Sequence, residues 1–157
     1  MDAPKPYVEF FVPGKPAGAG SKTIGRNAQG RTWVRPASKA TKPWMAVVSS
    51  YAVQAMSEAM KSPIQAGAVL LWISFRMPRP QSHFRTGAHA GELKANAPHY
   101  CISGLDLTKR VRALEDACKG IVWRDDRQVA IQNTSSLYVK TGEPNGAHVK
   151  VFLLEAP

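Results

Sequence analysis

Cysteine and long apolar runs are both scarce in this chain, and each absence excludes a class of protein. Only two cysteines occur in 157 residues, Cys101 and Cys118, so the chain can build neither a disulfide framework nor a four-cysteine zinc site. We expect both to be reduced thiols, with Cys118 packed in the core. No apolar run approaches the roughly 18 residues that span a bilayer, and residues 1–13 lack the features of a secretory signal. The sequence therefore predicts a cytoplasmic protein with no membrane partner.

Acidic residues are also few, and they are unevenly distributed. The chain has 11 Asp and Glu against 21 Lys and Arg, which gives a formal net charge of +10. No acid occurs in residues 10–57, a stretch with these basic residues: Lys15, Lys22, Arg26, Arg31, Arg35, Lys39 and Lys42. Positive charge organised in this way is typical of proteins that bind a polyanion such as nucleic acid. A generically basic soluble protein is the simpler alternative.

The acids that are present gather in residues 104–129, at Asp106, Glu115, Asp116, Asp125 and Asp126. Clustered carboxylates raise one another's pKa unless a cation compensates, so the cluster favours a site for a hard divalent metal, which takes oxygen ligands. Local roles explain the same residues equally well. Asp is a preferred residue at a helix start, and two adjacent Asp residues before a strand are typical of a turn. Spacing alone leaves both explanations open.

The apolar patterns predict one α+β domain over residues 1–157, with two main helices and a small mixed β-sheet. We expect helices at 41–60 and 107–119, and strands at 7–12, 31–35, 66–77, 122–123, 128–139 and 148–154. Two long basic segments separate these elements, a glycine-rich flexible loop at 15–35 and a loop at 78–103. Long loops in compact domains are usually functional or disordered. The predicted DNA contacts are Lys15, Lys22, Arg26 and Arg31 in the first loop and Arg79 and Arg85 in the second.

The acidic segment resembles the RusA family of Holliday junction resolvases, which occurs in phages and prophages. The family pattern runs approximately Pro-Asp-x-Asp-Asn-x-x-Lys, Asp-Ala-Leu-x-Gly and Asp-Asp-x-Gln-Val. The chain has Leu105-Asp106-Leu107-Thr108-Lys109, Asp116-Ala117-Cys118-Lys119-Gly120 and Asp125-Asp126-Arg127-Gln128-Val129 at the same spacing. An N-terminal strand followed by Pro-Gly-Lys-Pro, and residues 75–86, are also similar to phage members. The resemblance covers most of the chain.

This resemblance implies a RusA-like fold, a twofold homodimer and a magnesium-dependent endodeoxyribonuclease that resolves four-way DNA junctions in recombination and repair. Asp106 and Asp126, with Asp125, would hold Mg2+. Arg112 or Lys109 would stabilise the negative charge that develops on the phosphate. If a phage encodes the chain, the host cytoplasm would be its location.

Two positions depart from the family pattern. Thr108 stands where the family has its second aspartate, and Arg112 stands at the lysine position. A carboxylate is therefore missing, and Asp125 or Asp116 would have to replace it. For Asp116, an ion pair with Arg112 one helical turn earlier is the simpler expectation.

Two other functions remain open at this point. A junction- or single-strand-binding protein with weakened or lost catalysis would use Trp33 and the loop at 15–35 to grip DNA, and Thr108 favours this reading. A nuclease that cuts other branched DNA is the second alternative. The irregular spacing of His83, His89 and His99 is unlike a zinc site and fits phosphate contact or solvation.

Overall fold

A four-stranded mixed β-sheet forms the centre of the molecule. The computed structural model describes residues 5–20, 22–36 and 38–154. The sheet has the order β1-β6-β4-β5, built from β1 (Val8–Pro13), β4 (Val69–Met77), β5 (Val129–Tyr138) and β6 (Gly146–Leu153). β4 and β5 are parallel, and the other pairs are antiparallel. The predicted α+β class with a mixed sheet is confirmed.

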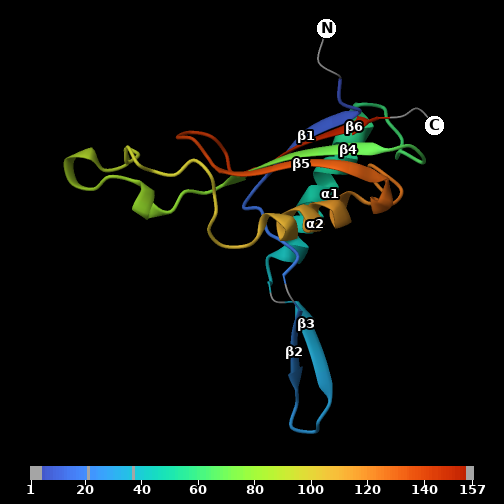
Figure 1. Cartoon of the computed structure of the whole chain (residues 1–157), viewed down its shortest axis with the longest axis horizontal. Coiled ribbons are helices and arrows are strands. Elements are labelled where there is room, and N and C mark those ends of the chain that lie inside the picture. Colours follow the sequence, from blue (N-terminus) through green and yellow to red (C-terminus); the bar gives the residue numbers. More distant parts are fainter. Residues whose placement is uncertain (1–4, 21, 37, 155–157) are drawn as a thin grey trace.

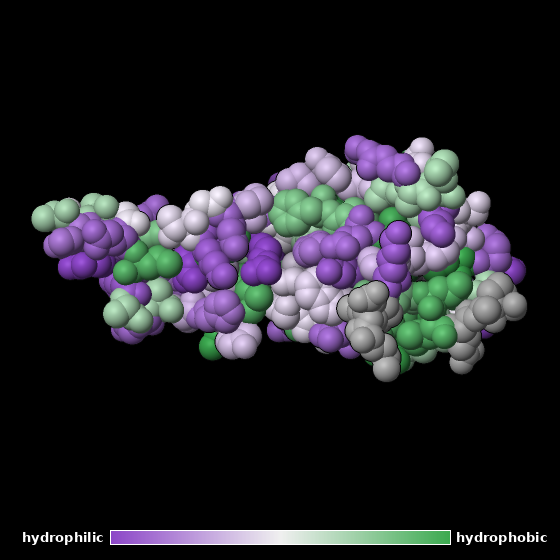
Figure 2. All heavy atoms as spheres, turned by 90° about the horizontal axis from the view of Figure 1, so that it is seen from above, coloured by the Kyte–Doolittle hydropathy of each residue, from purple (hydrophilic) through white to green (hydrophobic). Residues whose placement is uncertain are grey.

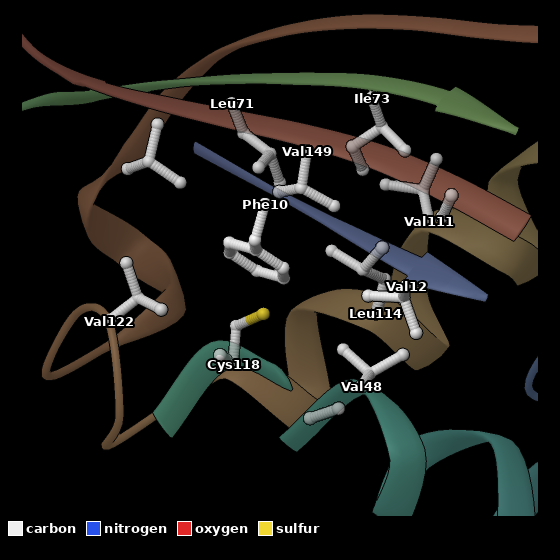
Figure 3. Close-up of a cluster of buried hydrophobic side chains, with 14 of the residues drawn as sticks. Phe10, Val12, Val48, Leu71, Ile73, Val111, Leu114, Cys118, Val122 and Val149 are labelled. Atoms are coloured by element: carbon white, nitrogen blue, oxygen red, sulfur yellow. The ribbon is translucent and has the colours of Figure 1, made fainter. Parts of the chain in front are cut away.

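Both helices cover one face of the sheet, and the core lies between these layers (Figure 1). α1 (Thr41–Glu58) and α2 (Leu107–Cys118) pack on each other, and Ser49 Oγ on α1 donates to the Ala117 carbonyl oxygen at 2.9 Å. Alternation along β4 and β6 turns one set of side chains toward the helices. Figure 3 shows the core that these side chains form with those of β1 and the helices, and it includes Phe10, Val12, Val48, Leu71, Ile73, Val111, Leu114, Cys118, Val122 and Val149. Both cysteines are free and buried, and Cys118 lies in the core as expected.

Two segments project from this body (Figure 1). One is an antiparallel hairpin of β2 (Lys22–Arg26) and β3 (Thr32–Pro36). The other, which we call the arm, is residues 78–103, with single 3-10 turns at Gln81–His83 and Gly87–His89 and a bridge between Phe84 and Leu93. Figure 2 shows the arm as a long extension with hydrophilic side chains over much of its surface.

Within the basic segment 15–35, the strand predicted at 31–35 is confirmed as β3, whereas residues 22–26, which were predicted to belong to a flexible loop, form β2. Residues 22–26 have no apolar alternation of their own, and they become a strand by pairing with β3. A tight turn joins the strands, with the backbone N–H of Arg31 donating to Asn27 Oδ1 at 2.8 Å and Gly30 at a φ of 76°. Asn and Gly favour such turns.

The other predicted elements are confirmed with small shifts in their ends, except one. Residues 122–123 form no strand; Trp123 makes only isolated bridges to Ile64 and Lys119, and its side chain is fully buried. No helix among residues 5–20, 22–36 and 38–154 is long and apolar enough to cross a bilayer.

A close backbone approach ties the segment before the hairpin to the start of α2. The backbone N–H of Ala19 donates to the Lys109 carbonyl oxygen at 2.9 Å, and Thr41 Oγ1 donates to the Gly18 carbonyl oxygen at 2.6 Å. A Cβ at Gly18 would lie 2.9 Å from the Lys109 carbonyl carbon and 3.0 Å from the Arg110 nitrogen. Only glycine fits at this position.

Gly18→Ala is therefore expected to destabilise the protein by ~1–3 kcal/mol, the usual cost of forcing extra atoms into a packed site. Urea unfolding followed by circular dichroism measures this loss. An unchanged transition midpoint would show that the segment moves away from α2 at no cost.

Candidate functional site

Asp106 stands at the start of α2 and points into solvent. It is the N-cap residue, yet within the described chain its side chain accepts no capping hydrogen bond. Its carboxylate is 69% exposed, and Lys109 Nζ lies 3.5 Å from Oδ2. Asp106 therefore does not form the N-cap hydrogen bond that its sequence position allowed. Its carboxylate is available to a ligand, with Lys109 next to it.

Asp126 lies beyond the other end of α2 and is held in a fixed orientation. It begins the single 3-10 turn Asp126–Gln128. Trp123 Nε1 donates to Asp126 Oδ1 at 3.0 Å, and Lys119 Nζ lies 3.5 Å from Oδ2. Because the Trp123 ring is fully buried, this hydrogen bond anchors the carboxylate to the core. The side chain remains 34% exposed.

Asp125 has the turn role that its sequence context also allowed. Its carboxylate accepts from the backbone N–H of Arg127 at 3.0 Å and from Arg127 Nε and Nη2 at 3.1 and 3.3 Å, and Gln128 completes a capping box. The Arg127 hydrogen bonds, from side chain and backbone, lower the pKa of Asp125 to about 2. These bonds use both of its oxygens, so Asp125 serves the local backbone.

The structure does not bring Asp106 and Asp126 together in one chain. α2 has 12 residues, which at about 1.5 Å per residue separate its ends by about 18 Å. Asp126 contacts Lys119, just past the end of the helix, because the chain turns back at Gly120, where the Gly120 N–H donates to the Trp123 carbonyl oxygen at 2.7 Å. Across the described ranges, no group of three or more His, Cys, Asp or Glu side chains is placed to hold a metal. The carboxylate oxygens suit a hard divalent ion, but a single chain does not assemble enough of them.

Glu115 is a neighbour of Asp126 that the sequence analysis did not include in the site. Its Oε1 accepts from Gln132 Nε2 at 2.5 Å, and the group is half-buried. Burial raises the pKa of Glu115, the Gln132 hydrogen bond opposes this rise, and the charges of Asp126 and Asp116 add to it. Its position four residues after the buried Val111 was the signal that could have found it, because it places Glu115 beside the apolar face of α2.

The exposed face of α2 carries charges without partners. Arg112 and Asp116 are both exposed. The expected ion pair between them is not formed; these described residues have no salt bridge. Thr108 is also exposed and lines, with Asp106 and residues 134–136 of β5, a cavity of ≈ 640 Å³. An aspartate at position 108 would therefore share this cavity with Asp106.

The predicted DNA contacts fall into two kinds. Lys15 at the base of the hairpin, and Arg26 and Arg31 on it, are exposed, while the side chain of Lys22 lies outside the described part. Arg79 instead holds the arm to the body, with Nε donating to the Val139 carbonyl oxygen at 2.7 Å and Nη1 to that of Pro98 at 2.8 Å. Arg85 pairs with Glu92 at 3.0 Å inside the arm. Of the predicted contacts, the exposed basic side chains of the hairpin are therefore more available to DNA than Arg79 and Arg85 of the arm, which are already engaged within the chain.

A comparison with protein families finds one match, to the model of endodeoxyribonuclease RusA, over residues 13–152. No curated protein matches the chain significantly. The matched span contains β4, β5, all of β6 but its last residue, the hairpin, the arm and both ends of α2, and it includes only the last residue of β1.

Glu115→Gln is expected to raise the melting temperature at pH 7 and to have less effect near pH 4. The pKa of Glu115 is raised in the fold, so its ionised form costs stability above that pKa, and the cost disappears as pH falls through it. Gln keeps an oxygen that can accept from Gln132. Thermal unfolding across this pH range measures the difference.

Glu58→Gln is the matched control, because exposed Glu58 accepts a similar bond from Gln54 Nε2 at 2.8 Å. An equal gain in both variants at pH 7 would contradict a repulsive cluster at the end of α2.

Proposed function

We propose that this chain, which belongs to the RusA family of endodeoxyribonucleases, cuts four-way DNA junctions in a magnesium-dependent reaction as a twofold homodimer. The observation that carries the proposal is the placement of solvent-facing carboxylates at both ends of α2 in an otherwise strongly basic molecule. Such carboxylates suit a hard cation, and the basic surface suits a polyanion.

The separation of Asp106 from Asp126 favours a site shared between two chains. A twofold axis across the middle of α2 would run two copies of this helix antiparallel. Asp106 of one chain would then face the partner's Asp126, and the arrangement would be repeated at the other end. The partner's Glu115, which lies beside its Asp126, would supply the carboxylate that is missing at position 108. Two matched sites would also suit a substrate with approximate twofold symmetry.

The exposed side of α2 and the neighbouring strand support this arrangement. Near the middle of the helix, Arg112 and Asp116 have no partner in the described structure. Across a twofold axis, Arg112 of one chain would face the partner's Asp116, and the reverse pair would form as well. β5 is an edge strand, which in the described chain meets only a bridge from Tyr100 to Leu137 on its outer side. Ile131 on β5 is 48% exposed. An open edge with an exposed apolar residue is a common place for chain association.

Each candidate residue has a distinct part in the proposed reaction. Mg2+ would lower the negative charge on the scissile phosphate and the pKa of an attacking water. Asp106 and the partner's Asp126 would hold the ion, with Asp126 oriented by the buried Trp123. Lys109, 3.5 Å from Asp106, and Arg112 would stabilise the charge that develops on the phosphate oxygens.

The hairpin is the proposed grip on DNA outside the reacting phosphate. It extends from the body (Figure 1), its described charges are positive, and Ile24 and Val34 lie exposed and opposite each other on it. Contacts of this kind position a nuclease on the backbone without reading sequence.

A binding protein with weakened catalysis is the alternative that one observation favours. Thr108 occupies the cavity beside Asp106 where the family pattern has a carboxylate. A nuclease for other branched DNA would show the same metal dependence with a different preferred substrate, so labelled four-way junctions, forks, duplexes and single strands belong in the same assay.

Asp106→Asn and Asp126→Asn are each expected to lower magnesium-dependent junction cleavage by orders of magnitude while binding in EDTA survives, because each removes a carboxylate from both sites. An equal mixture of the two variants, unfolded and refolded together, should recover activity. Half of the dimers would be mixed and would have one intact site, so about a quarter of the wild-type nicking rate is expected. The mixed dimer should nick one strand and leave the junction unresolved.

The control mixture pairs Asp106→Asn with the double variant that also has Asp126→Asn, and it should stay inactive. Wild-type-like cleavage by either single variant would remove that residue from the site. No recovery in the first mixture, with dimers present by sedimentation, would exclude a shared site.

The double change Arg26→Ala and Arg31→Ala is expected to weaken junction binding for all sequences. Each lost phosphate contact should reduce the slope of log affinity against log salt by about 0.9. Fluorescence anisotropy in EDTA over a salt series measures the slope. Arg85→Ala is the control, since Arg85 already pairs with Glu92, and an equal effect per residue there would place the contact on the arm as well.

A further inference from the structure

Arg110 on α2 is a buried cation that has no acidic partner in the part of the chain that the structure describes. Its side chain is 3% exposed. Nη1 donates to Ser136 Oγ at 2.9 Å and Nη2 to the Ser103 carbonyl oxygen at 3.5 Å, while Nε has no hydrogen-bond partner among the described residues. Arginine stays charged in proteins, and a buried charge without a counter-ion is costly. The position therefore suits an anion that comes from outside the chain.

Arg110 lines a cavity of ≈ 660 Å³ where the base of the hairpin, the start of the arm and the start of α2 meet. Lys15 and Arg79 add two further positive charges to its wall, and Ser38, Ser103 and Tyr138 add hydroxyl groups. No acid is present among the described residues that line it. A cavity of this size has room for a phosphate with an attached sugar.

Cys101 lines the same cavity and is a second group there whose negative charge the surroundings favour. Burial alone raises the pKa of this thiol. Hydrogen bonds with Tyr138 and Ser103 and the charge of Arg110 outweigh that effect, so the pKa of Cys101 lies below its usual value. The same surroundings would stabilise another small anion.

We propose that this cavity binds a phosphate group, with Arg110 as its direct ligand, and that the phosphate belongs to the DNA backbone next to the one that is cut. The planar guanidinium fork matches the oxygens of a phosphate. Cys101, Gly104 and Leu105 separate this cavity from the one that contains Asp106, because these residues line both. A strand that runs from the hairpin to Asp106 would pass its mouth. The assignment to DNA rests on the proposed nuclease function, whereas the phosphate chemistry does not.

The first test uses inorganic phosphate and the metal-free protein. Phosphate, compared with chloride at equal ionic strength, should raise the melting temperature of the wild type by ~3 °C at about ten times the dissociation constant. Arg110→Met should lose this response, and Arg110→Lys should retain a weaker one. Arg124→Met has the same charge change at an exposed residue outside the cavity and should respond like the wild type. Equal responses in Arg110→Met and wild type would overturn the proposal.

Alkylation of Cys101 gives a second measurement that needs no variant. Phosphate should slow its reaction with iodoacetate several-fold in the wild type, as followed by mass spectrometry. Cys118 is an internal control, because burial raises its pKa and leaves it unreactive. Full reactivity of Cys101 in saturating phosphate would place the anion elsewhere and contradict the proposal.

Junction binding in EDTA then decides the source of the phosphate. Arg110→Met should lower the slope of log affinity against log salt by about 0.9 if the cavity takes a DNA phosphate. An unchanged slope, together with a lost phosphate response, would overturn the DNA assignment and leave a site for free phosphate. A wild type that binds phosphate at Arg110 but never cuts DNA would refute the nuclease function and not the cavity.

Discussion

Burial of one face of α2 against α1 and the sheet determines where every acidic candidate can lie. Val111, Leu114 and Cys118 are buried on that face, and burying such side chains stabilises by about 1.5–3 kcal/mol each. A helix held this firmly acts as a rigid spacer. Its length keeps Asp106 and Asp126 apart, and the same packing leaves Arg112 and Asp116 on the opposite, solvent-facing side. The proposed site shared by two chains depends on the rigidity of this one element.

The two ends of α2 differ in their electrostatic surroundings. At the end of α2, burial raises the pKa of Glu115, and repulsion from Asp126 and Asp116 adds to this rise; a cation bound there would relieve the repulsion. At the start of α2, Arg110, Lys15 and Arg79 make the adjoining cavity positive. In the proposed reaction, a phosphate chain would be attracted to this positive cavity and would approach the carboxylates at the end of α2 only with a metal ion bound there. This difference in charge between the two ends of one helix defines the direction of the proposed DNA path.

Several features of the fold followed from local patterns because they depend on short-range physics. The apolar run over residues 66–77 and the helical spacing of apolar residues from Leu107 to Cys118 each reflect burial, and both elements were predicted within a few residues. β2 was missed because the sequence of residues 22–26 has no apolar alternation. It is a strand through hydrogen bonds to β3 across a tight turn, and such pairing has no signature in the strand itself.

The chain's own sequence determined the α+β class, the basic surface and the identity of the acidic residues, because composition and periodicity follow directly from residue types. Only the tertiary structure decided which of these residues meet. It engaged Asp125 with Arg127, separated Asp106 from Asp126 by the length of a helix, and brought Glu115 to Asp126. It also buried Arg110 with no acidic partner among the described residues, although Arg112 on the same helix is exposed. Such outcomes depend on where the chain reverses after α2 and on what packs beneath it, and these are properties of the whole fold.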